Sequence, residues 1–533
     1  MRKNIATQSQ TCHHPSIMPS LNLTRVHSGA LHGVDALSIE IEVNEGRGDP
    51  SIVIVGLPDV AVKESRDRVW TAIGNMGYRK PKGRTTINLA PADVRKEGPS
   101  FDLPIAIGIV ALLEDLKEGA LEQCSIVGEL ALDGRVRPVK GILSLTLEAK
   151  AAGKKAILVP HKNAREASLV EGIYVYGIPD LRSAIDLLKG EGNIAPEKID
   201  REDFFRQQSH YDIDFNDVKG QTHVKRALEV AVAGAHNALM IGPPGTGKSM
   251  LAKRLTTIMP PMTENEAIET TKIHSVAGLI DSRQSFIATR PFRSPHHTIS
   301  DAGLLGGTSH PSPGEVSLAQ NGILFLDELP EFRRSTLEVL RQPLEDGKVT
   351  ISRAAGTFTF PCEFMLIGAM NPCPCGYLGD PKKQCRCSAG QIEKYRQRIS
   401  GPLLDRIDLH VEVPSVDYKQ LSSNEGGGDS STTIRQRVET CRQIQQQRFA
   451  DHPRPITNSN MPSKLVRQHC QLEPESHALL EQAMNELNFS ARAHDRILKV
   501  SRTLADLEAI EQIQPQHLLE AIQYRSLDRN LWA

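Results

Sequence analysis

A glycine-rich loop near the middle of the chain has the residue types and spacing of a phosphate-binding loop. It follows the apolar run NALMIG and precedes the helical run MLAKRLTTIM. A strand, a glycine loop and a helix in this order let backbone N–H groups surround phosphates at a helix N-terminus. These flanks disfavour the alternative, an ordinary glycine-rich turn. We therefore predict that ATP is bound by Gly242, Pro243, Pro244, Gly245, Thr246, Gly247, Lys248, Ser249 and Met250.

Within this loop, two side chains are expected to act on the phosphates directly. Lys248 is predicted to reach the β- and γ-phosphates, and Ser249 to bind Mg²⁺.

The apolar run GILFL ends in Asp327 and Glu328, as a buried parallel strand would at its C-terminal end. Asp327 is expected to hold the Mg²⁺, and Glu328 to orient or deprotonate the attacking water.

Two further polar residues follow in the order expected of such an ATPase. Asn371 ends the apolar run FMLIGAM and could hydrogen-bond the water or the γ-phosphate, although asparagine at a strand end is more often a turn former. Arg406, in LLDRID, could stabilise transition-state charge on a neighbouring copy's ATP, although a surface ion pair is the ordinary role of an arginine. A shared site of this kind implies a closed ring.

Four cysteines form a close cluster in the sequence after Asn371. The pairs C-P-C and C-R-C are separated by a polar loop that contains Gly376 and Gly379. Four thiolates could bind tetrahedral Zn²⁺ as a closed structural site, whereas reduced loop cysteines are the competing interpretation. The predicted zinc ligands are Cys373, Cys375, Cys385 and Cys387.

The chain has 533 residues, which is too long for one ordinary domain. With 63 basic and 64 acidic residues, net charge gives no indication of a nucleic-acid partner. The longest apolar stretch, from Pro104 to Leu113, is shorter than the roughly 20 residues that a membrane-spanning helix needs, and the N-terminus lacks the apolar core of a signal peptide. We therefore expect a cytoplasmic protein without a membrane partner.

Composition and periodicity divide the chain into successive segments. Strand-like runs such as SIEIEV and TTINLA alternate with helical ones in the N-terminal part, a second α/β unit surrounds the glycine loop, and the C-terminal part is helical. The predicted segments are a disordered tail at 1–17, an N-terminal domain at 18–190, a linker at 191–215, an ATPase core at 216–418, a flexible linker at 419–436 and a helical lid at 437–533.

Beyond these motifs, long stretches of the chain resemble one family, the Mg-chelatase-like AAA+ ATPases of ComM, also called the YifB family. The resemblance runs from Leu21 to Leu527 through VGLPDVAVKESRDRV, RPFRSPHHTISDAGLLGG, PGEVSLAQNGILFLDELPEF and SARAHDRILKVSRTLADLE. It implies an α/β multidomain protein: a Lon-protease-like N-terminal α+β domain, a P-loop AAA+ α/β core of the helix-2-insert type, and a C-terminal helical lid. It further implies a homo-hexameric motor that moves on DNA, with helicase and branch-migration activity during natural transformation.

The resemblance also assigns individual residues. Arg406 matches the family's arginine finger, and Arg492 matches the arginine of the lid that touches the γ-phosphate, with Arg496 one helical turn further on as second choice. Two elements are expected to line the pore of the ring: the stretch 290–297, and a hairpin in GKVTISRAAGTFTF. Basic groups on such loops suit a phosphate backbone, although each is equally well explained as solvated charge. The predicted DNA contacts are Arg293, His296, Lys348 and Arg353.

The N-terminal domain is similar to the Lon-protease fold in GPSFDLPIAIGIV and GELALDGRVRPVKGILS. Ser100 falls at the nucleophile position, but Leu143 stands where the catalytic lysine belongs and cannot accept a proton. Lys140 would need a shift in register to substitute. We therefore expect Ser100 to cap the following helix, with Asp102 in its first turn, and the domain to be non-proteolytic.

Three classes of function remain at this point. The favoured one is an ATP-driven enzyme that moves DNA, with ATP and Mg²⁺ as cofactors. The alternative is a protein-remodelling motor of the Mg-chelatase type, which would hydrolyse ATP without DNA. An ATP-dependent protease is disfavoured by Leu143.

Overall fold

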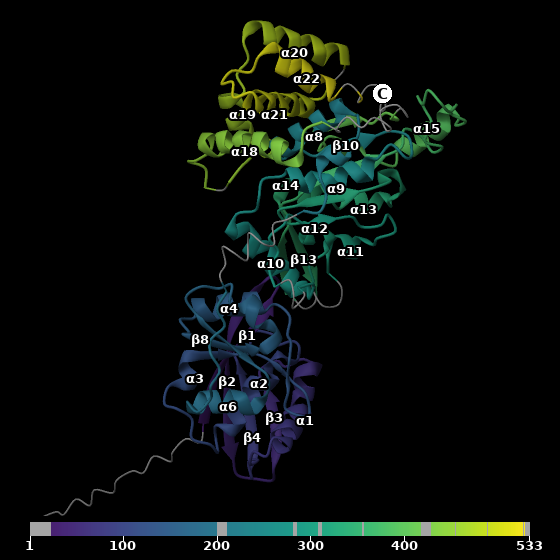
Figure 1. Cartoon of the computed structure of the whole chain (residues 1–533). Helices are drawn as coiled ribbons and strands as arrows, with labels where there is room; N and C mark the ends of the chain where they lie inside the picture. The colour runs from purple at the N-terminus through teal and green to yellow at the C-terminus, as the bar shows by residue number, and fades with distance from the viewer. Residues whose placement is uncertain are drawn as a thin grey trace, which may run out of the picture.

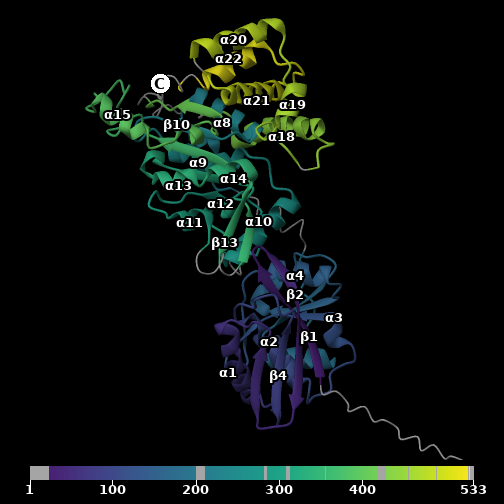
Figure 2. The same cartoon turned by 180° about the vertical axis from the view of Figure 1, so that it is seen from behind.

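The computed structural model describes residues 23–199, 211–280, 285–307, 312–353, 356–416, 428–453, 455–487, 489–525 and 527. Three units follow one another along the chain: an N-terminal unit, a central unit and a C-terminal helical unit. The central unit lies between the other two in both views (Figures 1 and 2). The predicted tail, 1–17, lies outside the described residues, as do parts of both predicted linkers.

The N-terminal unit is built around a mixed sheet. Its strands are β1 (Leu23–His32), β2 (Asp35–Gly46), β3 (Ser51–Val55), β4 (Arg84–Ala90), β5 (Cys124–Ile126), β8 (Ala156–Pro160) and β9 (Tyr174–Ile178). They lie in the order β3-β4-β2-β1-β5-β8-β9, and a separate short pair is formed by β6 (Glu129–Leu130) and β7 (Val136–Arg137). The alternation predicted in SIEIEV is confirmed, because Ile39, Ile41 and Val43 of β2 are buried while the glutamates between them are partly exposed.

Helices cover this sheet. They are α1 (Val60–Asn75), η1 (Pro99–Phe101), α2 (Asp102–Val110), α3 (Ala120–Gln123), α4 (Ile142–Ala151), η2 (His161–Asn163), α5 (Ala164–Ala167) and α6 (Leu181–Lys189). The prediction that Ser100 caps α2 is wrong, because Ser100 lies inside the turn η1 and the cap residue Phe101 makes no side-chain bond. Asp102 lies in the first turn as predicted, and its buried carboxylate accepts from Arg68 Nε at 2.9 Å.

The central unit contains a sheet in which every pairing is parallel. Its strands are β10 (Ala238–Ile241), β11 (Phe292–Arg293), β12 (Ile323–Leu326), β15 (Met365–Met370) and β16 (Leu409–Glu412). They lie in the order β11-β12-β15-β10-β16. Helices on both faces bury β10, β12 and β15 completely, which explains their continuous apolar sequences. The C-terminal ends of these three strands meet at one edge.

The helices of the central unit connect these strands. They are η3 (Phe215–Asp217), α8 (Thr222–Gly234), α9 (Lys248–Ile258), α10 (Glu264–Ala277), α11 (Asp301–Leu305), α12 (Glu315–Leu318), η4 (Leu329–Glu331), α13 (Arg334–Glu338), α14 (Arg341–Asp346), α15 (Ala389–Arg396) and α16 (Gly401–Leu404). α10 shows why such a helix begins where it does: Thr263 and Glu266 form a capping box at its start. The helical run after the glycine loop is confirmed as α9.

The predicted hairpin is present. It consists of β13 (Lys348–Arg353) and β14 (Gly356–Pro361), and its register pairs Val349 with Phe360 and Ile351 with Phe358. Val349, Ile351 and Phe360 are buried, so the alternation places one face of the hairpin on the central unit.

The C-terminal unit consists of helices in the described ranges: α18 (Ser431–Arg448), α19 (Ser463–His469), α20 (Pro474–Leu487), α21 (Ala491–Leu507) and α22 (Pro515–Gln523). α18 begins at Ser431, within the range predicted as linker 419–436, because the side chain of Ser430 accepts from Thr433 N and starts the helix there. Among the described helices, none has the length and apolarity that crossing a membrane requires.

The N-terminal unit contacts the central unit through α4 and α10. Leu143, the residue at the expected lysine position, is fully buried in an apolar cluster with Met262, Ala267 and Phe286 of the central unit. Gly141 N donates to the carbonyl oxygen of Ser275 at 3.1 Å. The turn of the β1–β2 hairpin also reaches the β13–β14 hairpin, where the rings of His32 and Phe358 are 4.9 Å apart. Helices, hairpins and an apolar cluster therefore join these two units.

Candidate functional site

The glycine loop connects β10 to α9 at the C-terminal edge of the central sheet. Gly245 and Gly247 have φ angles of 79° and 86°, a left-handed conformation that glycine adopts without steric strain. Lys248 begins α9, so the first amide groups of this helix border the loop. The nine predicted ATP-binding residues therefore form one continuous loop and the first turn of a helix, a geometry that suits a polyphosphate.

Lys248 reaches across this loop to the end of β15. Its Nζ donates to two carbonyl oxygens of the loop at 2.7 and 2.9 Å, and to Asn371 Oδ1 at 3.2 Å. Burial lowers the pKa of Lys248, and the carboxylates of Asp327 and Glu328 oppose this shift. A cation held between the loop and the end of β15 is placed to bind phosphate oxygens.

Ser249 and Asp327 face each other. The hydroxyl of Ser249 donates to Asp327 Oδ2 at 2.6 Å, which joins α9 to the end of β12. Asp327 Oδ1 in turn accepts from Glu328 N at 2.9 Å. A hydroxyl and a carboxylate at this separation offer two hard oxygen ligands, which is the donor set that Mg²⁺ prefers. The structure thus brings Lys248, Ser249, Asp327 and Asn371 to one edge of the sheet.

Glu328 adopts an unusual backbone conformation. Its φ and ψ angles are 52° and 47°, in the left-handed region that residues other than glycine seldom occupy. Its exposed side chain extends toward the segment after β11, where His297 Nδ1 lies 3.5 Å from Glu328 Oε2. Glu328 therefore faces a histidine, while its charge also acts on Lys248.

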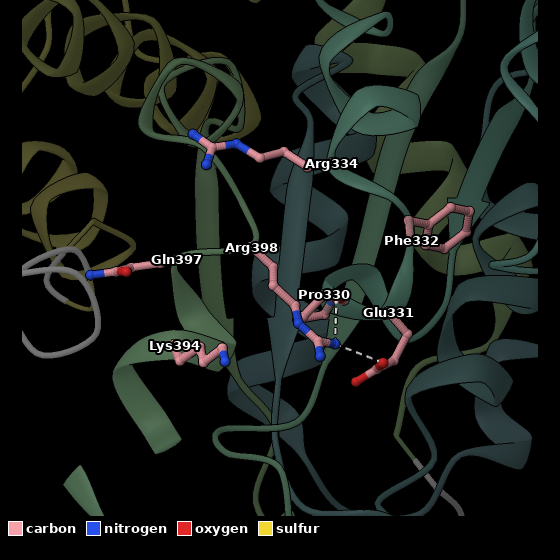
Figure 3. A pocket seen from close by; sticks show the side chains of 7 residues that line it. All are labelled: Pro330, Glu331, Phe332, Arg334, Lys394, Gln397 and Arg398. Carbon is pink, nitrogen blue, oxygen red and sulfur yellow. Dashed lines mark hydrogen bonds and ion pairs between the residues drawn. The ribbon is translucent and has the colours of Figure 1, made fainter. Parts of the chain in front are cut away.

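The turn that follows Glu328 borders an open pocket of about 510 Å³. Figure 3 shows Arg398 pointing from one wall toward the turn, where its Nη1 donates to Pro330 O at 3.2 Å and to Glu331 Oε2 at 2.8 Å. Arg334 and Lys394 contribute further positive charge. Arg398 thus fixes the turn directly after the acidic pair.

Arg406 does not lie beside the glycine loop. Its side chain is only 7% exposed, and its guanidinium donates to Glu345 of α14 and to the carbonyl oxygen of Pro402. The finger role predicted for Arg406 therefore requires the guanidinium to exchange Glu345 for another partner.

The two candidate arginines of α21 differ from each other. Arg492 is 62% exposed, and its Nη1 lies 3.6 Å from Asp405 Oδ2, close to the segment that carries Arg406. Arg496 instead donates to buried Asp408 at 2.7 Å. Burial alone would raise the pKa of Asp408, but Arg496 and the nearby His236 lower it. Arg496 thus neutralises a buried charge, which favours Arg492 as the candidate for ligand contact.

The four clustered cysteines converge as predicted. Cys373 Sγ lies 3.4 Å from Cys375 Sγ and 3.7 Å from Cys385 Sγ, and all four sulfur atoms, including that of Cys387, are within 4.8 Å of one another. Ligands at about 2.3 Å from a tetrahedral Zn²⁺ would be roughly 3.8 Å apart. These sulfur atoms fit a closed tetrahedral site.

This cysteine loop packs against the glycine loop. A Cβ atom at Gly376 would lie 2.7 Å from Pro244 Cδ, and the φ angle of Gly376 is 84°. Close approach and a left-handed backbone both require glycine at this position. The cysteine loop is therefore a direct neighbour of the predicted nucleotide site.

The predicted DNA contacts occupy different environments. Arg293 forms a two-bond ion pair with Glu315, with both distances 2.7 Å, whereas His296 and Lys348 are exposed. Arg353 ends β13, and its side chain lies outside the described residues. The intramolecular pair weakens the expectation for Arg293, because its charge already has a partner.

In the N-terminal unit, polar groups near the expected protease site take part in the contact with the central unit. Glu166 is buried between the units, where its Oε1 accepts from Leu143 N at 3.3 Å and from the hydroxyl of Ser275. Burial raises the pKa of Glu166 to about 7. Lys140 lies against Gly278 of the central unit, so it is directed to the domain contact. Leu143 and Lys140 are thus both used in joining the units.

Two residues of this site were not identified from the sequence. Gln221 Nε2 donates to Thr246 O and Pro414 O, both at 3.0 Å, and so connects the glycine loop to the segment after β16. His297 is the second: His296 was selected from the sequence, and the motif SPHHT contains both histidines. No local pattern distinguishes which of two adjacent histidines points to Glu328.

Comparisons with known proteins cover most of the chain. Residues 214–421 match the family described as Magnesium chelatase, subunit ChlI, residues 40–163 match Subunit ChlI of Mg-chelatase, and residues 428–525 match Magnesium chelatase, subunit ChlI C-terminal.

The chain is also similar to individual proteins over most of its length. The chain is 44% identical over 514 residues to competence protein ComM of Haemophilus influenzae, covering 96% of this chain and 99% of that protein. It is 44% identical over 512 residues to YifB, an uncharacterized protein of Escherichia coli, covering 96% and 98% respectively. A Lon protease of Elusimicrobium minutum is 31% identical over 143 residues, which is 26% of this chain and 17% of that protein. The chain therefore belongs to the Mg-chelatase-like AAA+ family of ComM and YifB, a membership that indicates ATPase activity.

Proposed function

We propose that this chain is an ATP-driven DNA translocase and helicase that promotes branch migration of recombination intermediates during natural transformation. ATP hydrolysis is supported by the convergence of Lys248, Ser249, Asp327 and Asn371 at one edge of the central sheet. The DNA substrate and the link to transformation rest on similarity over 96% of the chain to a protein named competence protein ComM.

Each residue of the site has one role in this proposal. Lys248 binds the β- and γ-phosphates, while Ser249 and Asp327 would hold Mg²⁺, which would supply positive charge next to the transferring phosphoryl group. Glu328 orients or deprotonates the attacking water, and Asn371 hydrogen-bonds the water or the γ-phosphate. The bond from Lys248 Nζ to Asn371 at 3.2 Å supports this assignment, because it aligns both side chains at the same position.

The proposed assembly is a homo-hexameric ring. Arg406 would act on the ATP of the neighbouring copy, after exchanging Glu345 for phosphate oxygens. Arg492 would approach the γ-phosphate from the C-terminal helical unit, which would act as a lid. Its 62% exposure supports that role, although it would have to leave Asp405 to reach the phosphate.

Two elements of the central unit are proposed to line the pore of the ring, as in ATPases of the helix-2-insert type, and to face DNA there. They are the segment between β11 and α11, which exposes His296, and the hairpin β13–β14, which exposes Lys348. Arg353 lies at the hairpin's turn, and Arg293 would have to leave Glu315 to take part. Cations at these positions suit a phosphate backbone.

The cysteine loop is proposed to bind one structural Zn²⁺. Sulfur distances of 3.4 to 3.7 Å support this, and Cys373, Cys375, Cys385 and Cys387 would occupy all four positions of a tetrahedron. Since this loop touches Pro244, the metal would stiffen the support of the nucleotide loop.

The test is ATP hydrolysis by the full chain with and without single-stranded and forked DNA. Lys248→Ala serves as the blank, because it removes the cation that binds the phosphates. We expect DNA to stimulate the wild-type rate, and this stimulation to weaken with rising salt as phosphate contacts do. Strand displacement on forked substrates would then follow.

A protein-remodelling motor is the second candidate, favoured by the match of residues 214–421 to the Magnesium chelatase family. Such a motor would hydrolyse ATP with the same residues but at a rate indifferent to DNA. A wild-type rate that neither DNA substrate changes would therefore reject the translocase and support this alternative.

A further inference from the structure

Basic residues are concentrated in one stretch of the central unit, from the cysteine loop to the segment after α15. The stretch 381–398 contains six basic residues and one acidic residue, whereas the whole chain has a net charge of −1. α15 protrudes from the central unit in both views (Figures 1 and 2). The protrusion therefore has a strongly positive local charge on a chain that is nearly neutral as a whole. Its basic residues are Lys382, Lys383, Arg386, Lys394, Arg396 and Arg398.

Three cations surround the open pocket of about 510 Å³ beside the turn η4. Lys394 comes from α15, Arg398 from the segment that follows it, and Arg334 from the first turn of α13. Figure 3 shows the amino group of Lys394 pointing toward the guanidinium of Arg398. Among the described residues that line the pocket, Glu331 is the only one with a carboxylate side chain. The pocket is therefore positively charged overall.

The cations of this pocket are weakly engaged within the chain. Lys394 and Arg334 are exposed, and neither forms an ion pair within the described ranges. Arg398 pairs with Glu331 at 2.8 Å, but the two side chains are 49% and 43% exposed. An ion pair so open to water is weak, so a ligand with stronger negative charge can take the place of Glu331. All three cations are thus available to an anion from solution.

The surroundings of the pocket favour one kind of anion, the phosphate backbone of a single-stranded nucleic acid. Lys383 of the cysteine loop lies over the ring of Tyr377, with its Nζ 4.8 Å from the ring centroid, and Tyr377 is partly exposed. An aromatic ring beside exposed cations suits a base stacked next to its phosphate, and carboxylate side chains of an acidic peptide do not supply such stacking. A free phosphate ion would fill only a small part of the pocket.

We propose that the pocket lined by Arg334, Lys394 and Arg398 binds the phosphate backbone of a single-stranded nucleic acid. It would be a second contact, in addition to the residues proposed to face DNA at the segment after β11 and at the hairpin β13–β14. Such a contact would hold one strand beside the turn η4. That the nucleic acid is DNA rests on the proposed translocase function, whereas the preference for a chain of phosphates follows from the charges of the pocket.

The experiment measures binding of a fluorescent single-stranded oligonucleotide of about 20 nucleotides, longer than one binding site, to the full chain by fluorescence anisotropy. In the double variant Arg334→Glu with Lys394→Glu, we expect the dissociation constant to rise at least roughly ten-fold, because two phosphate contacts are replaced by repulsion. The slope of log K against log salt should become shallower by about 1.4, the value for two contacts on a single strand. Arg398 stays unchanged, because it also fixes the turn after the acidic pair.

A matched double variant controls for net charge. Lys162→Glu with Lys464→Glu makes the same change in charge at exposed lysines of the N-terminal and C-terminal units, and it should bind the oligonucleotide like the wild type. Circular dichroism melting should give the same midpoint for all three proteins, because the four substituted side chains are exposed. Equal losses of binding in the two double variants would show a general electrostatic effect and overturn the pocket.

A competition measurement tests the class of ligand. Poly-glutamate at the same concentration of charge should displace the oligonucleotide from the wild type only weakly, because it offers neither phosphates nor bases. Displacement as strong as that by unlabelled oligonucleotide would assign the pocket to an acidic protein and reject a nucleic acid.

ATP hydrolysis by the same proteins separates this inference from the proposed function. If single-stranded DNA leaves the wild-type rate unchanged, the translocase proposal fails, yet binding that is lost only in the pocket variant still supports the pocket. If DNA stimulates hydrolysis and both double variants bind the oligonucleotide like the wild type, the translocase proposal stands and the pocket is rejected. A wild type that does not bind the oligonucleotide rejects both.

Discussion

The central and N-terminal units both resemble enzyme scaffolds, but they use their key positions in opposite ways. In the central unit, Ser249 and Asp327 point at each other across a loop shaped for phosphates. In the N-terminal unit, Leu143 stands at the expected lysine position and is buried against the central unit, and Glu166 is bonded to Ser275. One scaffold directs polar groups to a ligand, whereas the other directs them to its neighbour.

The difference shows that a scaffold alone does not decide activity. A proton acceptor beside Ser100 would be needed for protease chemistry, and an apolar side chain cannot supply one. Burial of Leu143 instead gives the contact between the units an apolar centre. Substitutions at these positions test whether the central unit is catalytic and whether the N-terminal unit only packs against it.

The largest effect is expected for Asp327→Asn. Asparagine still offers an oxygen to the Ser249 hydroxyl but replaces the anionic ligand for Mg²⁺ with a neutral amide, so ATP hydrolysis should fall by about 10²–10³-fold. Steady-state phosphate release over a range of Mg²⁺ concentrations measures this. Asp451→Asn, an exposed aspartate beyond α18, is the matched control and should hydrolyse ATP normally. Equal rates in the two variants would contradict the assigned site.

Leu143→Lys tests the N-terminal unit directly. A lysine in the apolar cluster would bury an unpaired charge, so the free energy of unfolding should fall by about 3–5 kcal/mol. Urea unfolding measures this loss, and casein hydrolysis should remain undetectable. Leu143→Met, which keeps apolar volume, should unfold like the wild type. Protease activity in Leu143→Lys would mean that the unit is a protease lacking only its lysine.

The contact between the units should depend on pH through Glu166. Burial raises the pKa of this carboxyl to about 7, above its unfolded value of about 4.3. The protonated carboxyl is therefore favoured in the folded protein. Its contribution, on the order of 3–4 kcal/mol, is fully present below about pH 4.3 and is lost as pH rises through about 7.

Glu166→Gln should remove this part of the pH dependence, because its neutral amide oxygen still accepts from Ser275. Urea unfolding of both proteins between pH 5 and 8 provides the measurement. Parallel pH profiles for variant and wild type would show that Glu166 does not control the contact.

The smallest effect on stability is expected at the cysteine cluster. Cys375→Ser should abolish binding of about one zinc per chain while lowering the melting temperature by only roughly 2–4 °C, because three of the four cysteines are only partly buried. Elemental analysis and melting curves give these values. Cys124→Ser in the N-terminal unit should leave the zinc content unchanged. A wild-type protein purified with zinc present but free of bound metal would refute the site.

Short-range patterns predicted the elements of the nucleotide site. The glycine loop followed from its residue spacing, and the strands that end before Asp327 and Asn371 followed from their apolar runs, whereas the hairpin β13–β14 followed from the resemblance to the family. Contacts between distant segments were not predictable in this way. The pairing of Arg406 with Glu345 and the contact of His297 with Glu328 depend on how separate elements pack. Ser100 was misassigned as a cap because the turn η1 precedes α2.

The contact between Gly376 and Pro244 also constrains how this family can change over generations. A side chain at 376 would collide with the proline ring at 2.7 Å, so a replacement there needs a smaller residue at 244 and still has to adopt a strained left-handed backbone. The two loops are distant in sequence but should be inherited as a matched pair. Grafting either loop alone into a relative is therefore expected to fail where grafting both succeeds.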